Sequence, residues 1–141
     1  MELSGKRLVV TGGAGFVGSH LCERLADDND VVAVDDLSNG EREWVPDGVE
    51  LVEGDLTDPD VAAAAITADV DAVFHFAADK NAARDDIDQY RRNNRLTEAV
   101  VERMHEVGVS KIAFTSSSTV YGEAPRPTPE DYAPMEPISI Y

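Results

Sequence analysis

The sequence predicts an α/β fold in which a parallel sheet is doubly wound, with helices on both of its faces. Three observations support this prediction. Short apolar runs alternate along the chain with segments of helical periodicity. The run at 71–76 carries too little polarity for a solvent-exposed face. A glycine-rich turn at 11–18 joins the first run to the first helical segment. A sheet of this kind binds ligands at the carboxyl ends of its strands.

Local signals place the individual elements. Apolar positions 17, 21 and 25 recur at helical spacing directly after the glycine turn. Asp58 before Pro59 is typical of a capped helix start, and the helix that follows is expected over 61–66. The longest helical pattern covers 82–107 and is ended by Gly108. The strands are expected at 7–10, 30–35, 49–53, 71–76 and 111–115.

The chain has the length of one domain followed by an irregular segment. Its 141 residues, of which 43% are hydrophobic, suffice for one core. Prolines recur between 123 and 141, so we expect a domain over 1–122 and a loop over 123–141. No apolar run approaches the roughly 20 residues of a membrane span, and the first residues lack a signal pattern. We therefore expect a cytoplasmic protein without a membrane partner.

Side chains that form disulfides or bind metals are sparse. The single cysteine, Cys22, has no partner for an internal disulfide, and its position on the first helix indicates buried packing. The histidines at 20, 75 and 105 have no neighbours at metal-ligand spacing. The sequence therefore predicts no metal site.

The chain is strongly acidic. It has 28 acidic and 12 basic residues, which give a formal net charge of −16. Such a surface repels nucleic acid and excludes it as a partner. Self-repulsion of this size is relieved as salt shortens the Debye length, from about 10 Å at 0.1 M to about 3 Å at 1 M. The composition therefore suggests a halophilic source, with an ordinary acidic protein as the alternative.

The glycine-rich turn is a candidate phosphate site. Gly12, Gly15 and Gly18 would let the chain turn sharply, let backbone N–H groups approach a pyrophosphate, and let the helix pack closely on the strand. The phosphate would then lie at the N-terminus of the first helix. A turn-rich connection without a ligand is the alternative.

An acidic residue at the end of the second strand completes the pattern of a dinucleotide site. Asp35 follows the last glycine at close to the spacing of about 20 residues expected for a carboxylate that binds the adenosine ribose. Asp35 and Asp36 accept hydrogen bonds from a free 2′-hydroxyl but repel the 2′-phosphate of NADP, which favours NAD. Arg42 argues for NADP, although its position between two glutamates is more typical of a solvated loop residue. A strand-end turn residue is the alternative for Asp35.

Four motifs stand in order at the predicted carboxyl ends of strands: GGAGFVG at 12–18, DDLSNG at 35–40, HFAA at 75–78 and TSSSTVYG at 115–122. Through these motifs the chain resembles the extended short-chain dehydrogenase/reductases, which implies a Rossmann-like fold. Within that superfamily it is most similar to the NAD-dependent nucleotide-sugar epimerase/dehydratase family, in particular to its 4-epimerases of the UDP-glucose type.

The resemblance implies where NAD would lie. Phe16 and Val17 would contact the pyrophosphate, and residues 36–40 would wrap the adenosine end. Lys80 is the cation near the pyrophosphate, and Asn93 would reach in from the long helix, with packing or a solvated position as the alternative for both. The full set of expected cofactor-binding residues is Gly12, Gly15, Phe16, Val17, Gly18, Asp35, Asp36, Leu37, Ser38, Asn39, Gly40, Asp55, Leu56, Phe76, Ala77, Ala78, Lys80, Asn93 and Ser116.

The resemblance also implies the catalytic residues. Ser117 and Tyr141 match the serine and tyrosine with which the family moves the proton of a sugar hydroxyl while hydride passes to the nicotinamide. Thr119 is placed to contact the same sugar, so the expected substrate is a nucleotide sugar. Dehydratases of the family have an Asp-Glu pair where this chain has Ser118 and Thr119, which favours epimerisation over dehydration. A plain turn cluster is the alternative for 116–119.

The resemblance covers the whole chain but not the whole family protein. The family lysine that follows the tyrosine by four residues, and the sugar-binding lobe, lie beyond Tyr141. We therefore expect the NAD-binding portion of a 4-epimerase, which by itself does not turn over sugar. The family implies a homodimer through the helix at 82–107. An NAD sensor without chemistry, or a related NAD-dependent decarboxylase or reductase, remains an alternative.

Overall fold

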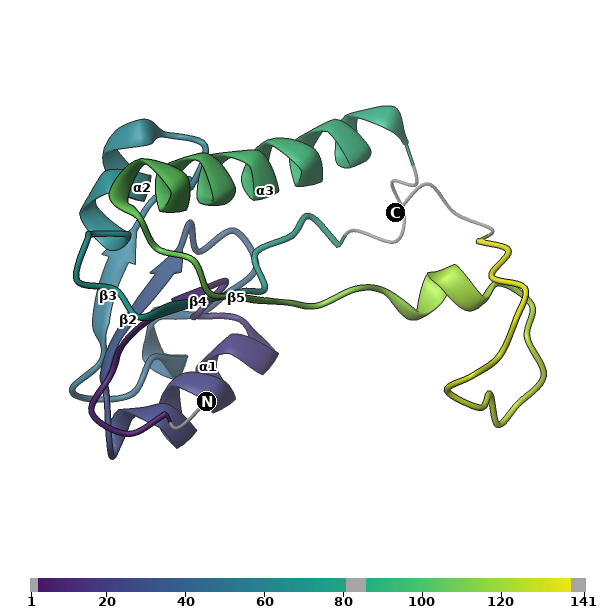
Figure 1. Ribbon diagram of the computed structural model, residues 1–141, viewed down its shortest axis with the longest axis horizontal. Helices are drawn as coiled ribbons and strands as arrows, with labels where there is room; N and C mark the ends of the chain where they lie inside the picture. The colour runs from purple at the N-terminus through teal and green to yellow at the C-terminus, as the bar shows by residue number, and fades with distance from the viewer. Residues whose placement is uncertain (1–2, 81–85, 138–141) are drawn as a thin grey trace.

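Five parallel strands form one sheet in the computed structural model, which describes residues 3–80 and 86–137 (Figure 1). The order of the strands across the sheet is β3-β2-β1-β4-β5, so β1 lies at the centre. At that centre Val9 pairs with Val32 on one side and with Val73 on the other. The predicted doubly wound, Rossmann-like parallel sheet is therefore confirmed. The strands are β1 (Arg7–Thr11), β2 (Asp30–Asp35), β3 (Glu50–Glu53), β4 (Ala72–His75) and β5 (Ile112–Phe114).

Helices cover both faces of the sheet, with α1 on one face and α2 and α3 on the other (Figure 1). Alternate strand residues face opposite ways, which divides the core into two layers. Leu8 and Val10 pack with Cys22 on the α1 side. Val9 packs with Val100 on the opposite side. The helices are α1 (Phe16–Ala26), α2 (Pro59–Ala65) and α3 (Ile87–Val107), and two short 3₁₀ helices, η1 (Arg42–Trp44) and η2 (Ser118–Tyr121), lie in connections.

Capping residues set the ends of the helices. Asp58 caps α2 by accepting a 2.9 Å hydrogen bond from the N–H of Asp60, and Pro59 occupies the first helical position, as predicted. Gly108 ends α3 in the left-handed conformation, also as predicted. The predicted start of this helix at 82 is wrong, because α3 begins at Ile87 after extended Asp86, whose Oδ1 accepts a 2.9 Å hydrogen bond from the N–H of Gln89. Residues 82–85 lie outside the described ranges.

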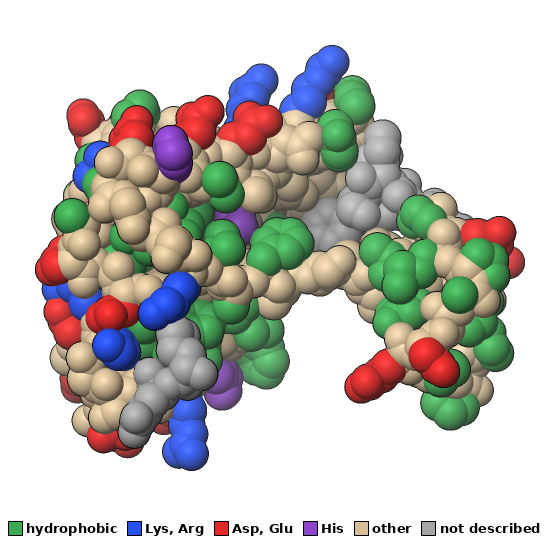
Figure 2. All heavy atoms as spheres, viewed as in Figure 1, with side chains coloured by type: hydrophobic (Ala, Val, Ile, Leu, Met, Phe, Trp, Pro, Cys, Tyr) green, Lys and Arg blue, Asp and Glu red, His purple; other side chains and the backbone are tan. Residues whose placement is uncertain are grey.

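The segment that follows β5 extends away from the sheet and helices (Figures 1 and 2). Over 123–137 it contains turns and no helix or strand. Within the described ranges β5 pairs with β4 alone, so it forms one edge of the sheet. Its side chains are exposed, and Phe114 has 62% of its surface open to solvent. An apolar sheet edge thus lies uncovered at the start of this segment.

Two further features of the described residues bear on function. None of their helices is both long and apolar enough to cross a membrane. Nor do residues 3–80 and 86–137 bring together three histidine, cysteine, aspartate or glutamate side chains in a group that could hold a metal ion. On the face shown in Figure 2, acidic side chains are spread out rather than gathered in one patch.

Candidate dinucleotide-binding site

The glycine turn connects β1 to α1 and lies against the segment that follows β4. Gly12 has a φ of +70°, and its N–H donates a 2.8 Å hydrogen bond to the carbonyl oxygen of Val34. A Cβ atom at Gly12 would lie 2.9 Å from the backbone nitrogen of Ala77. Both the left-handed backbone and the close approach therefore require glycine at this position.

Gly18 brings the first turn of α1 onto the glycine turn. A Cβ atom at this position would lie 2.1 Å from the carbonyl oxygen of Gly12 and 2.8 Å from its carbonyl carbon. Both neighbours are backbone atoms, so no side-chain rotation could relieve the clash. The sequence therefore fixes how closely α1 packs on the end of β1.

The N-terminus of α1 is open to an anion. Its N-cap residue is Gly15, which has no side chain to satisfy the first N–H groups of the helix, and its first turn carries no acidic residue. Phe16 and Val17 flank this terminus with 67% and 58% of their surfaces exposed. Free N–H groups at the positive end of a helix dipole suit a phosphate.

Asp35 reaches from the end of β2 to the glycine turn. Its Oδ2 accepts a 3.0 Å hydrogen bond from the N–H of Ala14, and its Oδ1 accepts a 2.9 Å hydrogen bond from the N–H of Leu37. The chain then folds back onto the turn, because a Cβ atom at Gly40 would lie 2.7 Å from the carbonyl oxygen of Ala14. The structure thus brings together the glycine turn and the segment 35–40, as the motifs implied.

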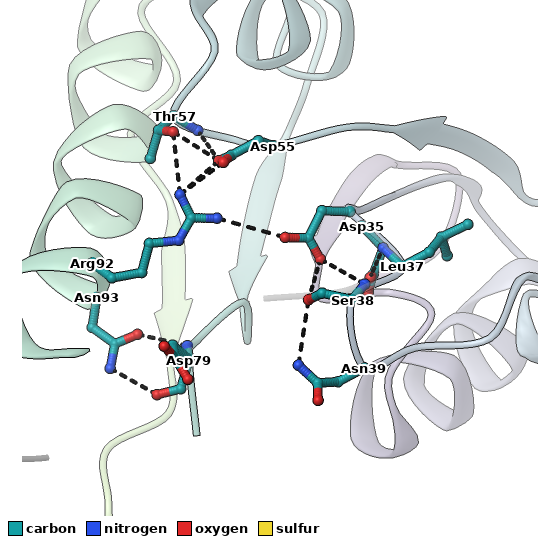
Figure 3. A network of polar contacts seen from close by, with 10 residues as sticks. Asp35, Leu37, Ser38, Asn39, Asp55, Thr57, Asp79, Arg92 and Asn93 are labelled. Atoms are coloured by element: carbon teal, nitrogen blue, oxygen red, sulfur yellow. Dashed lines mark hydrogen bonds and ion pairs between the residues drawn. The ribbon is translucent and has the colours of Figure 1, made fainter. Parts of the chain in front are cut away.

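An arginine on α3 that the sequence analysis did not single out reaches the carboxyl ends of the strands (Figure 3). The Nη1 atom of Arg92 donates to Asp55 Oδ2 at 2.7 Å, and its Nη2 atom lies 3.5 Å from Asp36 Oδ2. Thr57 hydrogen-bonds to Asp55 through its N–H and its hydroxyl, both at 2.8 Å. Burial alone raises the pKa of Asp55, but the hydrogen bonds from Arg92 and Thr57 outweigh it and hold the pKa below its usual value.

Asn93 and Gln89 on α3 hold the segment after β4, and Figure 3 shows the contacts of Asn93 with Asp79. The Oδ1 atom of Asn93 accepts from the N–H of Asp79 at 2.7 Å, and its Nδ2 atom donates to the Asp79 carbonyl oxygen at 3.0 Å. Gln89 Nε2 donates to the same carbonyl oxygen at 3.0 Å. The hydrogen-bond partner that polar Asn93 requires is therefore backbone, so any cofactor contact would be additional to this role.

The remaining residues of the expected set differ in how they are placed. Leu56 lies in the core with 3% of its surface exposed, so only its backbone can face a ligand. Phe76 and Ala77 are half-buried, and Ala78 and Lys80 are exposed. Arg42 is exposed and forms an ion pair with Glu53, as a solvated loop residue would. Lys80 is not the sole cation at this end of the sheet, since Arg92 is present as well.

A buried hydrogen-bonded chain, also missed from the sequence, links β1, β4 and α3. Thr11 Oγ1 lies 2.7 Å from His75 Nδ1 and accepts hydrogen bonds from the N–H groups of Phe76 and Ala77, both at 3.2 Å. Its own proton is therefore donated to Nδ1, which leaves His75 Nε2–H facing Thr97 Oγ1 at 3.2 Å. Burial lowers the pKa of His75, which favours this neutral form.

The expected catalytic segment lies apart from the glycine turn. Ser117 Oγ accepts hydrogen bonds from the N–H of Thr119 at 3.2 Å and from its hydroxyl at 2.9 Å, so these two residues are brought together. Ser116 is exposed just before them. Figure 1 shows η2, which contains Thr119, well removed from α1. Tyr141 lies outside the described residues.

The sheet order defines a domain of the Rossmann type, and the glycine turn at an open helix N-terminus and the carboxylate at the end of β2 form its candidate dinucleotide site. Its family follows from comparison with known proteins. The chain belongs to the NAD dependent epimerase/dehydratase family, whose model matches residues 8–141.

Similar proteins include a UDP-glucose 4-epimerase from Azospirillum brasilense, which is 38% identical over 141 residues. The match covers 96% of this chain and 40% of the relative. A crystal structure of a UDP-galactose 4-epimerase has a TM-score of 0.82 and 44% identity, with 96% of this chain and 46% of that one covered. A UDP-glucose-4-epimerase from Stenotrophomonas maltophila, crystallised with bound NAD and formylated UDP-arabinopyranose, has a TM-score of 0.83 and 31% identity over 96% of this chain and 44% of its own. The chain thus spans less than half the length of these relatives.

Proposed function

We propose that this chain binds NAD and provides the NAD-binding portion of a nucleotide-sugar 4-epimerase of the UDP-glucose type. The observation that carries the proposal is the open N-terminus of α1, with Asp35 held against the preceding turn through the N–H of Ala14. In this proposal the first N–H groups of α1 bind the pyrophosphate. The carboxylate of Asp35 accepts hydrogen bonds from the adenosine ribose.

The residues present fit a nicotinamide dinucleotide better than its 2′-phosphorylated form. Asp35 already accepts two backbone hydrogen bonds and, as a carboxylate, has capacity for about two more. Its negative charge repels a 2′-phosphate at short range. Arg92 pairs with the neighbouring Asp36 and not with Asp35, so the ribose-binding charge is not neutralised by it.

The chemistry of the proposed reaction rests on the segment after β5. When bound, NAD supplies the acceptor and donor of hydride for exchange at a sugar carbon. Tyr141 would take the proton of a sugar hydroxyl, with Ser117 steadying that proton and Thr119 contacting the sugar. Hydroxyl side chains at 118 and 119 provide no general acid for loss of water, which supports epimerisation. Because the relatives are more than twice as long, we propose that these 141 residues alone bind NAD without turning over sugar.

We further propose that α3 carries a homodimer interface. Ile87, Tyr90 and Val101 lie on one face of this helix at helical spacing and are 46–49% exposed. Sedimentation velocity of the wild type and of Tyr90→Glu tests this role. The wild type should sediment as a dimer and the variant as a monomer, whereas a monomeric wild type contradicts the interface.

The cofactor assignment is tested by calorimetric titration of NAD and NADP into the wild type and Asp35→Asn. The variant keeps the size of the side chain but removes the charge, so we expect the ratio of the NADP Kd to the NAD Kd to fall by about tenfold or more. Asp47→Asn, at an exposed position outside the site, is the control for net charge. An unchanged ratio in Asp35→Asn contradicts the assignment.

A further inference from the structure

A hollow lies between α1 and the connection that contains η1. Its volume of about 460 Å³ is within the range of small-molecule sites, about 300–1,000 Å³. Apart from Phe16, its lining residues have no part in the function proposed above. Glu23 lies about 10 Å further along α1 than Phe16, so the hollow extends away from the helix N-terminus. The lining residues are Phe16, Ser19, His20, Glu23, Trp44 and Pro46.

Aromatic rings form much of the lining. Phe16 and Trp44 have 67% and 46% of their surfaces exposed. The ring of His20 lies against that of Phe16, with the ring centroids 4.9 Å apart. The face of an aromatic ring carries partial negative charge and attracts a cation, and tryptophan does so most strongly. These walls therefore suit a cation that also has an apolar part.

Apart from the indole N–H of Trp44, the polar side-chain atoms of the hollow are acceptors. Ser19 Oγ donates its proton to the carbonyl oxygen of Phe16 at 3.2 Å. His20 Nδ1 lies 2.8 Å from the same oxygen, which can only accept, so Nδ1 carries a proton. In the neutral ring Nε2 then presents a lone pair. The carboxylate of Glu23 is exposed and has no ion pair within the part of the chain that the structure describes.

We infer that this hollow binds a primary alkylammonium ion. The carbon chain of the ion lies against the rings of Phe16 and Trp44. Its N–H groups donate to the carboxylate of Glu23 and to Nε2 of His20. An ammonium group has three donors and no acceptor, which matches a lining that offers lone pairs and one negative charge.

Other classes of ligand fit this lining less well. An anion would meet the carboxylate of Glu23 and no lysine or arginine side chain to pair with its charge. A neutral alcohol of the same shape gains the apolar contacts but not the ion pair. The net charge of −16 also raises the local concentration of cations around the chain. The ligand class is therefore a small organic amine.

NMR titration of the 15N-labelled chain at about pH 8, where an alkylamine is still an ammonium ion, tests the inference. The chain has a single tryptophan, so the indole N–H of Trp44 gives one resolved signal from the hollow. Three probes of one chain length are compared at constant ionic strength: pentylammonium, pentan-1-ol, which lacks the charge, and pentyltrimethylammonium, which lacks the N–H donors. We expect pentylammonium to cause saturable shifts at the indole and at the lining amides of α1. The other two probes should bind at least about threefold more weakly.

Variants separate the parts of the lining. Glu23→Gln should raise the pentylammonium Kd by about threefold, because one ion pair is lost. Glu43→Gln is the matched control, since Glu43 is exposed next to Trp44 but outside the lining, and it should leave the Kd unchanged. Trp44→Leu keeps an apolar side chain without the ring face and should raise the Kd by about threefold. Thermal unfolding of each variant shows whether it is folded under the titration conditions.

A change at the imidazole tests the hydrogen-bonding part of the inference. His20→Phe keeps a ring against Phe16 but removes Nε2. In this variant pentylammonium should lose most of its advantage over pentyltrimethylammonium, whereas both should bind more weakly to Glu23→Gln. If His20→Phe leaves that advantage intact, the imidazole is not an acceptor for the ammonium group and the assignment is wrong.

Each other outcome is decisive. The inference is wrong if pentylammonium causes no saturable shift up to about 50 mM, or if pentan-1-ol binds as tightly, because the hollow is then merely apolar. Equal weakening by Glu23→Gln and Glu43→Gln means that the amine responds to net charge alone, which also overturns the inference. Equal binding of pentylammonium and pentyltrimethylammonium to the wild type shows that no N–H group is recognised, with the same consequence. None of these titrations contains NAD, so the proposed function and this inference can fail independently.

Discussion

Replacement of Gly18 by alanine places a methyl group at the junction between the glycine turn and α1, where the structure leaves no room for it. The added methyl would lie 2.1 Å from the carbonyl oxygen of Gly12. Restoring an ordinary contact requires α1 to move by about 1 Å, and overpacking of this kind costs about 1–3 kcal/mol. The better helix propensity of alanine offsets about 1 kcal/mol of that cost. We therefore expect a net loss of up to about 2 kcal/mol in the free energy of unfolding and a fall of up to about 6 °C in Tm.

The same displacement moves the N–H groups at the start of α1 out of reach of a pyrophosphate. Hydrogen bonds weaken steeply with such shifts, so the NAD Kd measured by calorimetry should rise by tenfold or more, about 1.4 kcal/mol. Gly48→Ala is the control, because Gly48 has a φ of +90° with no atom within 4 Å of the added methyl. It should lower Tm through backbone strain and leave the Kd unchanged. A Gly18→Ala variant with the wild-type Kd would refute the reasoning.

Three further predictions concern stability. Burial lowers the pKa of folded His75 below 6.5, so protonation of His75 favours the unfolded chain. The free energy of unfolding should therefore decrease as the pH is lowered through about 6.5, and this decrease should be smaller in His75→Gln. Urea titrations at pH 5 and pH 7 measure the difference. The net charge of −16 predicts a Tm that rises between 0.1 and 2 M KCl, and a Tm that does not rise removes the halophilic interpretation. Asp58→Ala should lower the free energy of unfolding by about 1 kcal/mol in urea, because the cap of α2 is lost; no change would show that the cap is not stabilising.

Local sequence signals predicted most of the fold. The apolar run at 30–35 is β2, and the Asp58–Pro59 start and the Gly108 end of helices are where the sequence places them. These features depend on residues a few positions apart, which is the range over which capping and periodicity act. The start of α3 was placed too early, although Asp86 and Gln89, three residues apart, carry a capping signal that would have found it.

The parts of the site that were missed depend on tertiary contacts. Arg92 and Asp55 are 37 residues apart, and a charged residue on a helix is usually solvated, so nothing local marks Arg92. Thr11 and His75 are 64 residues apart and meet only because β1 and β4 are neighbours in the sheet. Asn93 was recognised as a polar residue that needs a partner, but its bonds to the Asp79 backbone follow from the path of the chain after β4.

NMR of the 15N-labelled chain during titration with NAD tests the central claim most directly. The account predicts saturable shifts that are largest at the backbone amides of 14–18, with smaller shifts at 35–40. NADP at the same concentrations should cause little change. The account is contradicted if NAD shifts no amide, or if the shifts gather instead at Trp44 and Pro46, on the side of a hollow of about 460 Å³ that lies opposite Phe16.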